Sequence, residues 1–368
     1  MVNKNGIVGF CRRALTAGGR LRGFNPGKEA FAKAKAEAHM KSFIIKENDA
    51  GQRLDKFLTK AVPRLPKNLL YKYIRLKRIK LNGGRCQISD RLSVGDCVTL
   101  YINDEFFESR GELDFLSCPP NMDIVYEDSN ILIVNKPCGL VVHDDDSQSL
   151  DTLLNRLKRY LYDKGEYIPQ NEASFTPALC NRLDRNTQGL VICAKNAESL
   201  RTMNLAIRKR WIEKRYLCVV IGEPVPEECV LEGYLVKRPA ENIVEVSKRE
   251  LPGSKRILTG YRVLEKRAGL SLCEIELITG RTHQIRAHMS FIGCPLLGDG
   301  KYGVNDLNRK YGVKTQALCA YRLEFKAGND YGSLGYLSGR EFKVDNIWFL
   351  SYFPSAAGYL AETLTKKG

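Results

Sequence analysis

Residues 180–196 read CNRLDRNTQGLVICAKN and join a charged cluster to an apolar run. Asp184 stands between Arg182 and Arg185, and turn-forming residues separate it from the apolar residues 190–194. A short apolar run bounded by Asn, Thr and Gly is typical of a buried strand that follows a turn. We therefore expect Asp184 on a loop that leads into a core strand, where functional residues are common.

The two guanidinium groups beside Asp184 favour its ionised form. An ionised and positioned carboxylate can be a nucleophile or can stabilise an electron-poor carbon. An ordinary surface loop with salt bridges would show the same local pattern, so this segment alone leaves both interpretations open.

Strands and helices alternate irregularly on both sides of this segment. The clearest patterns are, for strands, 131–134, 190–194, 216–221 and 271–278 and, for helices, 150–158, 197–208 and 282–292. The regular βαβα order of a parallel sheet is absent. The sequence favours an α+β fold whose mixed, largely antiparallel sheet is flanked by helices and loops. It holds no G-x-G-x-x-G or P-loop motif, so no nucleotide cofactor is expected.

Composition divides the 368 residues into five parts. They are a basic, disordered extension (1–40), a small α+β domain (41–103), a linker (104–118), a large α+β domain (119–355) and a tail (356–368). The extension is rich in Gly, Ala, Lys and Arg. A start site assigned too far upstream and a basic targeting leader are both compatible with it.

The positive charge gathers at the front of the chain. The net formal charge is +16, of which 1–40 carry +6, 41–103 carry +9 and 104–368 carry +1. A basic front on a nearly neutral body indicates a polyanionic partner, here RNA, although a charge run can also be a solvated face. The basic residues expected to contact RNA lie in and beside two short amphipathic helices: Arg53, Lys67, Lys72, Arg75, Lys77, Arg78 and Lys80.

Cysteine and histidine spacing gives no metal motif. The twelve cysteines lie at least eleven residues apart, and the four histidines form no H-E-x-x-H. We expect reduced core cysteines, no metal and a cytoplasmic protein. No apolar run is long enough to span a membrane.

Two further segments supply candidate site residues. In 277–303, a helix is expected to begin with Thr282 as its N-cap. His288 is expected in the buried stripe of this helix as a packing residue. Arg281 and Arg286 are expected outside that stripe, where they are free to bind an anion. In 214–224, Tyr216 opens a strand directly after two cations, so its ring is a candidate stacking platform. An ordinary strand tyrosine is the alternative.

Together these segments resemble the RluA family of pseudouridine synthases. The similar motifs are N-K-P-x-G-L at 135–140, R-L-D-x-x-T at 182–187, the tyrosine motif at 214–216, G-R-T-H-Q-I-R-x-H at 280–288, G-x-P-L-x-G-D at 293–299 and the closing strand at 316–323. Three residues depart from the family pattern: Asn181 and Cys319 replace histidines, and Gln188 replaces a serine. These departures affect loop details and target choice.

The front domain resembles the RNA-binding domain named for ribosomal protein S-four. The motifs that carry this resemblance are G-Q-R-L-D-K-F-L at 51–58, K-L-N-G at 80–83 and G-D at 95–96. The combination is typical of enzymes that modify large-subunit ribosomal RNA.

The resemblance implies an enzyme, expected to be monomeric, that isomerises a uridine in RNA without a cofactor. Asp184 would attack C1′ or abstract the 2′ proton, Tyr216 would stack on the freed uracil and Arg286 would pair with Asp184. Four residues would contact or surround the substrate: Arg182 at the flipped nucleotide, Arg281 as an anion partner, Leu318 in the pocket floor and Lys136 as a source of positive potential. A non-enzymatic RNA-binding protein and a glycoside hydrolase, which usually needs two carboxylates, are the alternatives.

Overall fold

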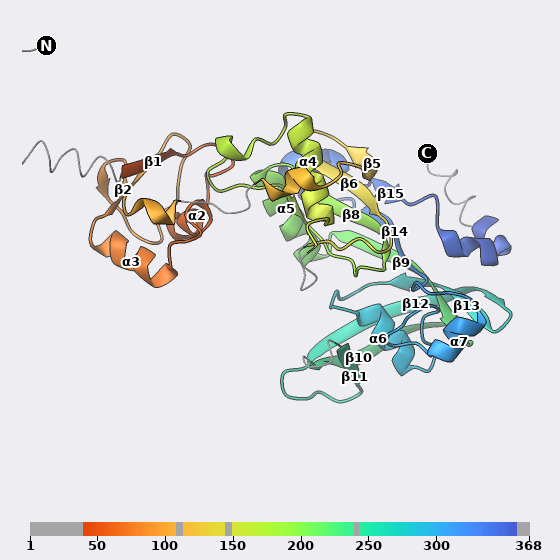
Figure 1. Cartoon of the computed structure of the whole chain (residues 1–368). Coiled ribbons are helices and arrows are strands. Elements are labelled where there is room, and N and C mark those ends of the chain that lie inside the picture. Colours follow the sequence, from red (N-terminus) through yellow and green to blue (C-terminus); the bar gives the residue numbers. More distant parts are fainter. Residues whose placement is uncertain (1–39, 108–112, 144–148, 239–242, 359–368) are drawn as a thin grey trace, which may run out of the picture.

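The computed structural model of the chain describes residues 40–107, 113–143, 149–238 and 243–358 (Figure 1). The expected basic extension up to residue 39 and the end of the expected tail, 359–368, lie outside these ranges. Within the described ranges, no helix has both the length and the apolarity needed to cross a membrane. The cysteines in these ranges, which do not include Cys11, are free thiols.

The front unit is a four-stranded antiparallel sheet with two helices against it. The strands follow the order β1-β4-β2-β3. Their bounds, with those of the helices, are β1 Met40–Ile44, α2 Leu54–Ala61, α3 Lys67–Arg75, β2 Ile79–Leu81, β3 Gly84–Arg85 and β4 Cys97–Tyr101. Leu54, Phe57 and Leu58 are fully buried, as the amphipathic pattern predicts, and they belong to a core that this unit forms by itself.

The body is built on an eleven-stranded sheet with the order β11-β10-β12-β13-β9-β14-β8-β6-β5, to which β15 and β7 add at β14 and β8. The strands are β5 Asp123–Glu127, β6 Ile131–Lys136, β7 Ala178–Leu179, β8 Gln188–Ala194, β9 Ile212–Ile221, β10 Glu228–Arg238, β11 Ile243–Ser247, β12 Lys255–Arg267, β13 Leu270–Glu276, β14 Leu318–Phe325 and β15 Glu341–Lys343. Among the described strand pairs of this sheet, only β8 and β14 run parallel. The expected mixed, largely antiparallel α+β fold is confirmed.

Four α-helices and several 3-10 turns complete the body (Figure 1). The helices are α4 Leu153–Asp163, α5 Ala197–Lys209, α6 Gln284–Phe291 and α7 Asn305–Lys310. Side chains of α4 and α6 join one core cluster, which includes Tyr216 and Cys218 of β9, while α5 joins another, which includes Leu217 and Val219. Successive side chains of a strand point to opposite faces, so β9 connects the two cores.

Strand β9 begins earlier than its sequence pattern predicts. Its pairing with β14 extends back to Ile212, which lies opposite Phe325, and both side chains are buried. Tyr216 therefore lies in the middle of the strand instead of opening it. The two cations before it, Lys214 and Arg215, are strand residues.

The expected linker packs more closely than its polar sequence indicates. The 3-10 turn η2, Asp114–Ser117, places Phe115 in the body core, where its ring lies edge-on to that of Tyr162 with 5.8 Å between ring centroids. At the other end of the body, Ala356 is 5% exposed and its N–H donates to Glu265. The packed structure therefore includes η2 and continues past residue 355.

The parallel contact between β8 and β14 leaves no room for a side chain at Gly189. Its φ is +127°, and a Cβ built there would lie 2.4 Å from the carbonyl oxygen of Ala320. The backbone of β14 passes directly against this glycine, five residues after Asp184, so the contact fixes where the Asp184 loop enters the sheet.

We predict that Gly189→Ala lowers the free energy of unfolding by about 2 to 4 kcal/mol, because the methyl group meets backbone that cannot move aside. The control is Gly253→Ala, which also has a positive φ of +76° but has open space around it. Urea denaturation of both variants measures the difference. A positive φ by itself costs a residue with a side chain about 1 kcal/mol. If both variants lost only this much free energy of unfolding, the close approach of the Ala320 backbone to residue 189 would be contradicted.

Candidate active site

A cavity of about 360 Å³ opens where the loop before β8, the middle of β9 and the segment between β13 and α6 meet. Five of the residues that the sequence singles out line it: Arg182, Asp184, Tyr216, Arg281 and Arg286. Leu318, the first residue of β14, lines it as well and is 4% exposed. Folding thus gathers residues from four separate motifs around one cavity.

A buried guanidinium holds the Asp184 carboxylate. Arg286 Nη1 donates to Asp184 Oδ2 at 2.9 Å, while its Nε and Nη2 donate to the two carboxylate oxygens of Asp299 at 2.7 and 2.9 Å. Asp299 is fully buried, Arg286 is 6% exposed, and the Asp184 side chain is 25% exposed. Arg286 therefore sits between an internal carboxylate and one that faces the cavity.

The electrostatics of this triad follow from burial and pairing. Burial alone would raise the pKa of Asp299, but the hydrogen bonds and charge of Arg286 hold it below its usual range. Burial would lower the pKa of Arg286, and the two carboxylates raise it above its usual range. The backbone N–H groups of Lys301 and Tyr302 also donate to Asp299. Arg286 is therefore a fixed cation.

The position of Arg286 corrects one sequence expectation. It does not lie free outside the buried stripe of its helix, because Asp299 draws its side chain inward. A described ion pair of Asp184 comes from Arg286, which is distant in the sequence, while the neighbours Arg182 and Arg185 are exposed. The helix itself begins at Gln284, with His283 instead of Thr282 at the cap position.

Tyr216 lies inside the cavity wall. It is 5% exposed, and burial followed by the charge of Asp184 raises the pKa of its hydroxyl above the usual range. The hydroxyl therefore stays protonated at neutral pH, and Tyr216 and Asp184 line the same cavity. Arg182 and Arg281 are exposed and lie at the rim of the cavity.

Lys136 does not line the cavity. Its fully buried ammonium donates to the carbonyls of Pro137, Leu140 and Arg185 at 2.8 to 2.9 Å. Burial lowers its pKa to about 8. Lys136 thus ties the loop after β6 to the Asp184 loop. Its charge acts on Asp184 from behind the cavity wall, so its expected role as a source of positive potential stays a prediction.

The sequence analysis missed His283, although it quoted the motif that contains it. His283 adopts a left-handed conformation with φ of 55°, which is uncommon for a residue with a side chain. Its Nε2 lies 3.8 Å from Asp184 Oδ2, and its Nδ1 lies 2.9 Å from the hydroxyl of Tyr302. Burial lowers its pKa. An unusual backbone angle has no local sequence signal when the residue is not glycine or asparagine.

Two more residues complete the site. Lys214 lines the cavity, and burial lowers its pKa. Thr187 is 2% exposed and accepts a hydrogen bond from Gln316 at 2.6 Å, which ties the Asp184 loop to the start of β14. His288 is an internal packing residue, as expected: it is 1% exposed, lies 3.0 Å from the Thr259 hydroxyl, and burial lowers its pKa to about 4.

Two of the three departures from the family pattern, Asn181 and Gln188, have hydrogen-bond partners, and the third, Cys319, is buried. Asn181 bridges to β8, since its amide donates to the Leu190 carbonyl at 3.2 Å and its side-chain oxygen accepts from the Ile192 N–H at 2.8 Å. Gln188 donates to the Asn346 carbonyl at 2.8 Å. Cys319 is fully buried. None of these contacts involves Asp184.

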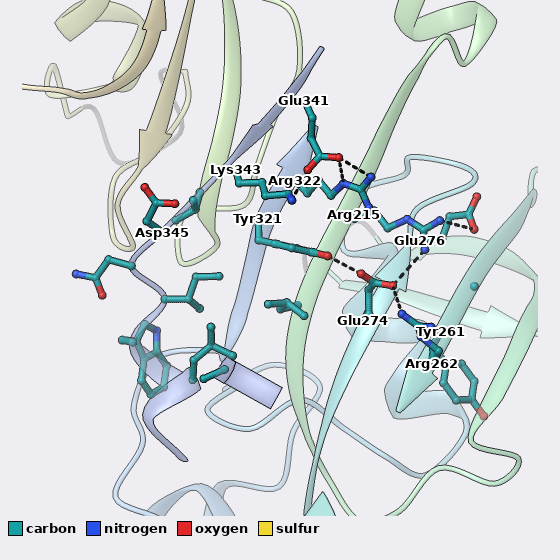
Figure 2. A pocket seen from close by; sticks show the side chains of 18 of the residues that line it. Arg215, Tyr261, Arg262, Glu274, Glu276, Tyr321, Arg322, Glu341, Lys343 and Asp345 are labelled. Atoms are coloured by element: carbon teal, nitrogen blue, oxygen red, sulfur yellow. Dashed lines mark hydrogen bonds and ion pairs between the residues drawn. The ribbon is translucent and has the colours of Figure 1, made fainter. Parts of the chain in front are cut away.

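A larger cavity, of about 1140 Å³, is lined by residues such as Arg215 and Leu217. Arg215 and Leu217 alternate with Tyr216 along β9, so their side chains point to the opposite face of the sheet. Figure 2 shows the charged lining of this cavity. Its charged groups pair with one another. Glu274 accepts from Tyr321, Arg215 and Arg262, and Arg322 pairs with Glu341. These ion pairs join neighbouring strands of the sheet. The residues that the sequence singles out line the smaller cavity around Asp184 instead, so that cavity is the candidate active site.

Comparisons with known proteins agree with this geometry. Residues 130–291 match the family model described as RNA pseudouridylate synthase. An uncharacterised RNA pseudouridine synthase of Mycoplasma genitalium is 32% identical over 292 residues, which cover 77% of this chain and 88% of the relative. The chain belongs to the RNA pseudouridine synthase family. It is therefore an isomerase that acts on RNA.

Other relatives agree. Ribosomal large subunit pseudouridine synthase C of Vibrio cholerae is 30% identical over 77% of this chain and 86% of its own length. The structure titled Human RNA Pseudouridylate Synthase Domain Containing 1 shares the fold, with a TM-score of 0.51, 21% identity and coverage of 70% of this chain and 98% of that one.

We predict that Arg286→Met makes stability fall as pH rises. In the natural protein, the pair stabilises the fold above about pH 4, the usual Asp pKa, and this contribution is lost as pH falls through the lower folded pKa. In the variant, Asp299 is buried without a cation, so its pKa rises and its ionisation becomes a cost. The expected loss is about 3 to 5 kcal/mol at pH 7.

Thermal unfolding at pH 5, 6.5 and 8 measures this trend. Arg309→Met is the matched control, because Arg309 pairs with Asp306 on the surface and both side chains are exposed. A stability loss in Arg286→Met that is equal at all three pH values would contradict the buried-charge explanation.

Proposed function

We propose that Asp184 is the catalytic residue and that the enzyme modifies uridines in large-subunit ribosomal RNA. The observation that carries the first part is the Asp184–Arg286–Asp299 triad beside the buried ring of Tyr216. Arg286 is fixed from behind by Asp299 and donates from Nη1 to Asp184. The carboxylate is thereby held in place at the cavity wall, where it can reach a bound nucleotide for attack or for proton abstraction.

The proposed reaction uses each group in turn. The C1′–N1 bond of the uridine breaks, the uracil turns over, a C1′–C5 bond forms, and the C5 proton is lost while N1 takes up a proton from water. Asp184 either attacks C1′ and is released when C5 bonds there, or removes the 2′ proton and returns it, and the geometry is compatible with both. Tyr216 stacks on the freed uracil while it turns, and Leu318 forms the apolar floor beneath it.

The uridine must leave its stack to reach Asp184, at a cost of a few kcal/mol. A cavity of about 360 Å³ falls within the size range of small-ligand pockets. The exposed guanidinium groups of Arg182 and Arg281 stand at its rim, where they would bind the phosphates that flank the flipped nucleotide. Lys214 adds positive potential from the wall, and His283 supports Asp184 from the other side.

The front unit is proposed as an RNA-binding domain of the ribosomal-protein-S-four type, joined to a catalytic domain by residues 104–118. Five of its seven candidate contact residues are exposed cations in or next to α3: Lys67, Lys72, Arg75, Lys77 and Arg78. Arg53 pairs with Asp55 at 3.0 Å, and Lys80 lies over the ring of Tyr101. The target class rests on the names of relatives such as the Vibrio cholerae enzyme.

We predict that Asp184→Asn abolishes pseudouridine formation while RNA affinity stays within about tenfold, or 1.4 kcal/mol. The amide keeps the shape but loses the charge. Asp345→Asn is the matched control, because Asp345 is an exposed acid in the larger cavity. The measurement is pseudouridine content of a ribosomal RNA fragment after incubation with each variant. Normal turnover by Asp184→Asn would rule out its catalytic role.

We predict that Lys72→Gln combined with Arg75→Gln weakens RNA binding and flattens its salt dependence. For each phosphate that the front unit no longer neutralises, the slope of log affinity against log salt should fall by about 0.7 for single strands or 0.9 for duplex. Lys310→Gln with Lys314→Gln removes the same charge from exposed sites on the body. Binding titrations at several salt concentrations measure the slope of log affinity against log salt for both double variants. Equal slopes for the two would show that only the net charge of the protein matters.

A further inference from the structure

The front unit is fastened to the body by a cluster of polar contacts. Its loop 45–52 meets two body segments, residues 171–174 and the start of α5. Lys46 Nζ donates to the Asn171 carbonyl at 2.7 Å, and Arg201 of α5 donates to the Ala50 carbonyl at 3.4 Å. Ala173 packs against the core of the front unit. These contacts join parts of the chain that lie more than 120 residues apart.

The centre of the contact is buried. Ser174 Oγ donates to Asp49 Oδ1 at 2.6 Å and accepts from Gln52 Nε2 at 2.8 Å. Asp49 has no exposed surface. A buried carboxylate is costly unless it is paired, so the seryl hydroxyl of the body contributes to the stability of the front unit's own loop.

Asn48 bridges both body segments with one side chain. Its amide nitrogen lies 3.3 Å from each carboxylate oxygen of Glu172, and its amide oxygen accepts from the N–H of Ala197, the first residue of α5. Burial, followed by the charge of Asp49, raises the pKa of Glu172. A change at Asn48 or Glu172 therefore acts directly on the contact.

Both body segments continue into the walls of the active-site cavity. Residues 171–174 lead through β7 to Cys180 and Asn181, which line the cavity before Asp184. Helix α5 touches the front unit at its first residue and reaches the cavity at Ile207. The front unit is thus docked on the same two segments that form one side of the site.

We propose that a polar latch of five residues (Asn48, Asp49, Gln52, Glu172 and Ser174) holds the front unit in a fixed position on the body. The basic face of the front unit, which is the set of exposed cations in and beside α3, is then at a fixed distance from Asp184. This distance determines which uridine is modified. The proposal rests on the proposed function of Asp184 and of the basic face. An RNA bound by α3 would then present only the uridine that lies at the matching distance. A tethered but undocked front unit would raise the local RNA concentration without choosing the position.

The decisive variant is Asn48→Asp. It retains the oxygen that accepts from Ala197 but places a carboxylate against Glu172, so the latch opens without a cavity being made. Glu172→Gln keeps the bond from Asn48 and serves as the matched control. The double variant Asn48→Asp with Glu172→Gln reverses donor and acceptor and should close the latch again. Ser42→Ala removes a hydroxyl contact with Thr99 inside the front unit, away from the latch.

Two measurements separate docking from chemistry. Hydrogen exchange at the Ala197 amide and solution X-ray scattering report whether the front unit is docked, and neither needs turnover. Steady-state kinetics and pseudouridine mapping use a folded large-subunit RNA fragment and a short RNA with the same uridine. For Asn48→Asp we expect faster exchange, a broader distance distribution, a KM about tenfold higher on the folded fragment with kcat within twofold, and modification at additional uridines.

The short RNA should be modified equally by all variants, and the double variant should recover the KM and the single site. The proposal would be overturned if the Asn48→Asp protein were undocked but still modified only the same uridine in the folded fragment. It would also be overturned if the front unit already moved freely in the natural protein. A natural protein that is docked but makes no pseudouridine in either RNA would instead contradict the proposed function.

Discussion

One buried guanidinium holds the centre of this enzyme together. Arg286 joins the Asp184 loop, helix α6 and the segment after it, because its side chain bonds carboxylates that belong to the first and the third. Removing a cation from water costs several kcal/mol unless its hydrogen-bonding groups find partners. Asp299 accepts from Nε and Nη2, and Nη1 on the other side of the guanidinium donates to Asp184. The need to satisfy the buried charge thus orients the carboxylate that faces the cavity.

The loop that carries Asp184 is held from several other directions. Lys136 donates a hydrogen bond to the Arg185 carbonyl, and Thr187 accepts one from Gln316. At Gly189 the loop enters the sheet, where the backbone of β14 leaves no space for a side chain. Rigid support of this kind keeps a reacting group within a fraction of an ångström of its working position. Substrate recognition is left to the exposed arginines at the rim and to the basic front unit.

Much of this arrangement could be predicted from the sequence, and the failures share a cause. Periodic apolar patterns placed the strands and helices, and the resemblance brought Asp184, Tyr216 and Arg286 together. The sequence did not reveal that Asp299 draws Arg286 inward, that Lys136 binds the Arg185 carbonyl, or that Phe115 anchors the linker. Each of these depends on contacts between distant segments, for which local charge and hydropathy give no signal. The left-handed His283 and the contact between Asn48 and Glu172 were missed for the same reason.

The burial of the cysteines determines when their thiols can react with oxidants and alkylating agents. Cys193 and Cys218 are fully buried, and the pKa of each thiol lies well above its usual range, for Cys193 because of burial and for Cys218 because of its neighbour Cys273 and burial. Thiolates, not thiols, react with oxidants and alkylating agents. Both sulfur atoms belong to the core that α4 and α6 cover, so they are inert while this core stays closed and become reactive when it opens. The rate at which an alkylating agent labels Cys193 and Cys218 therefore reports how often the core of the catalytic body opens.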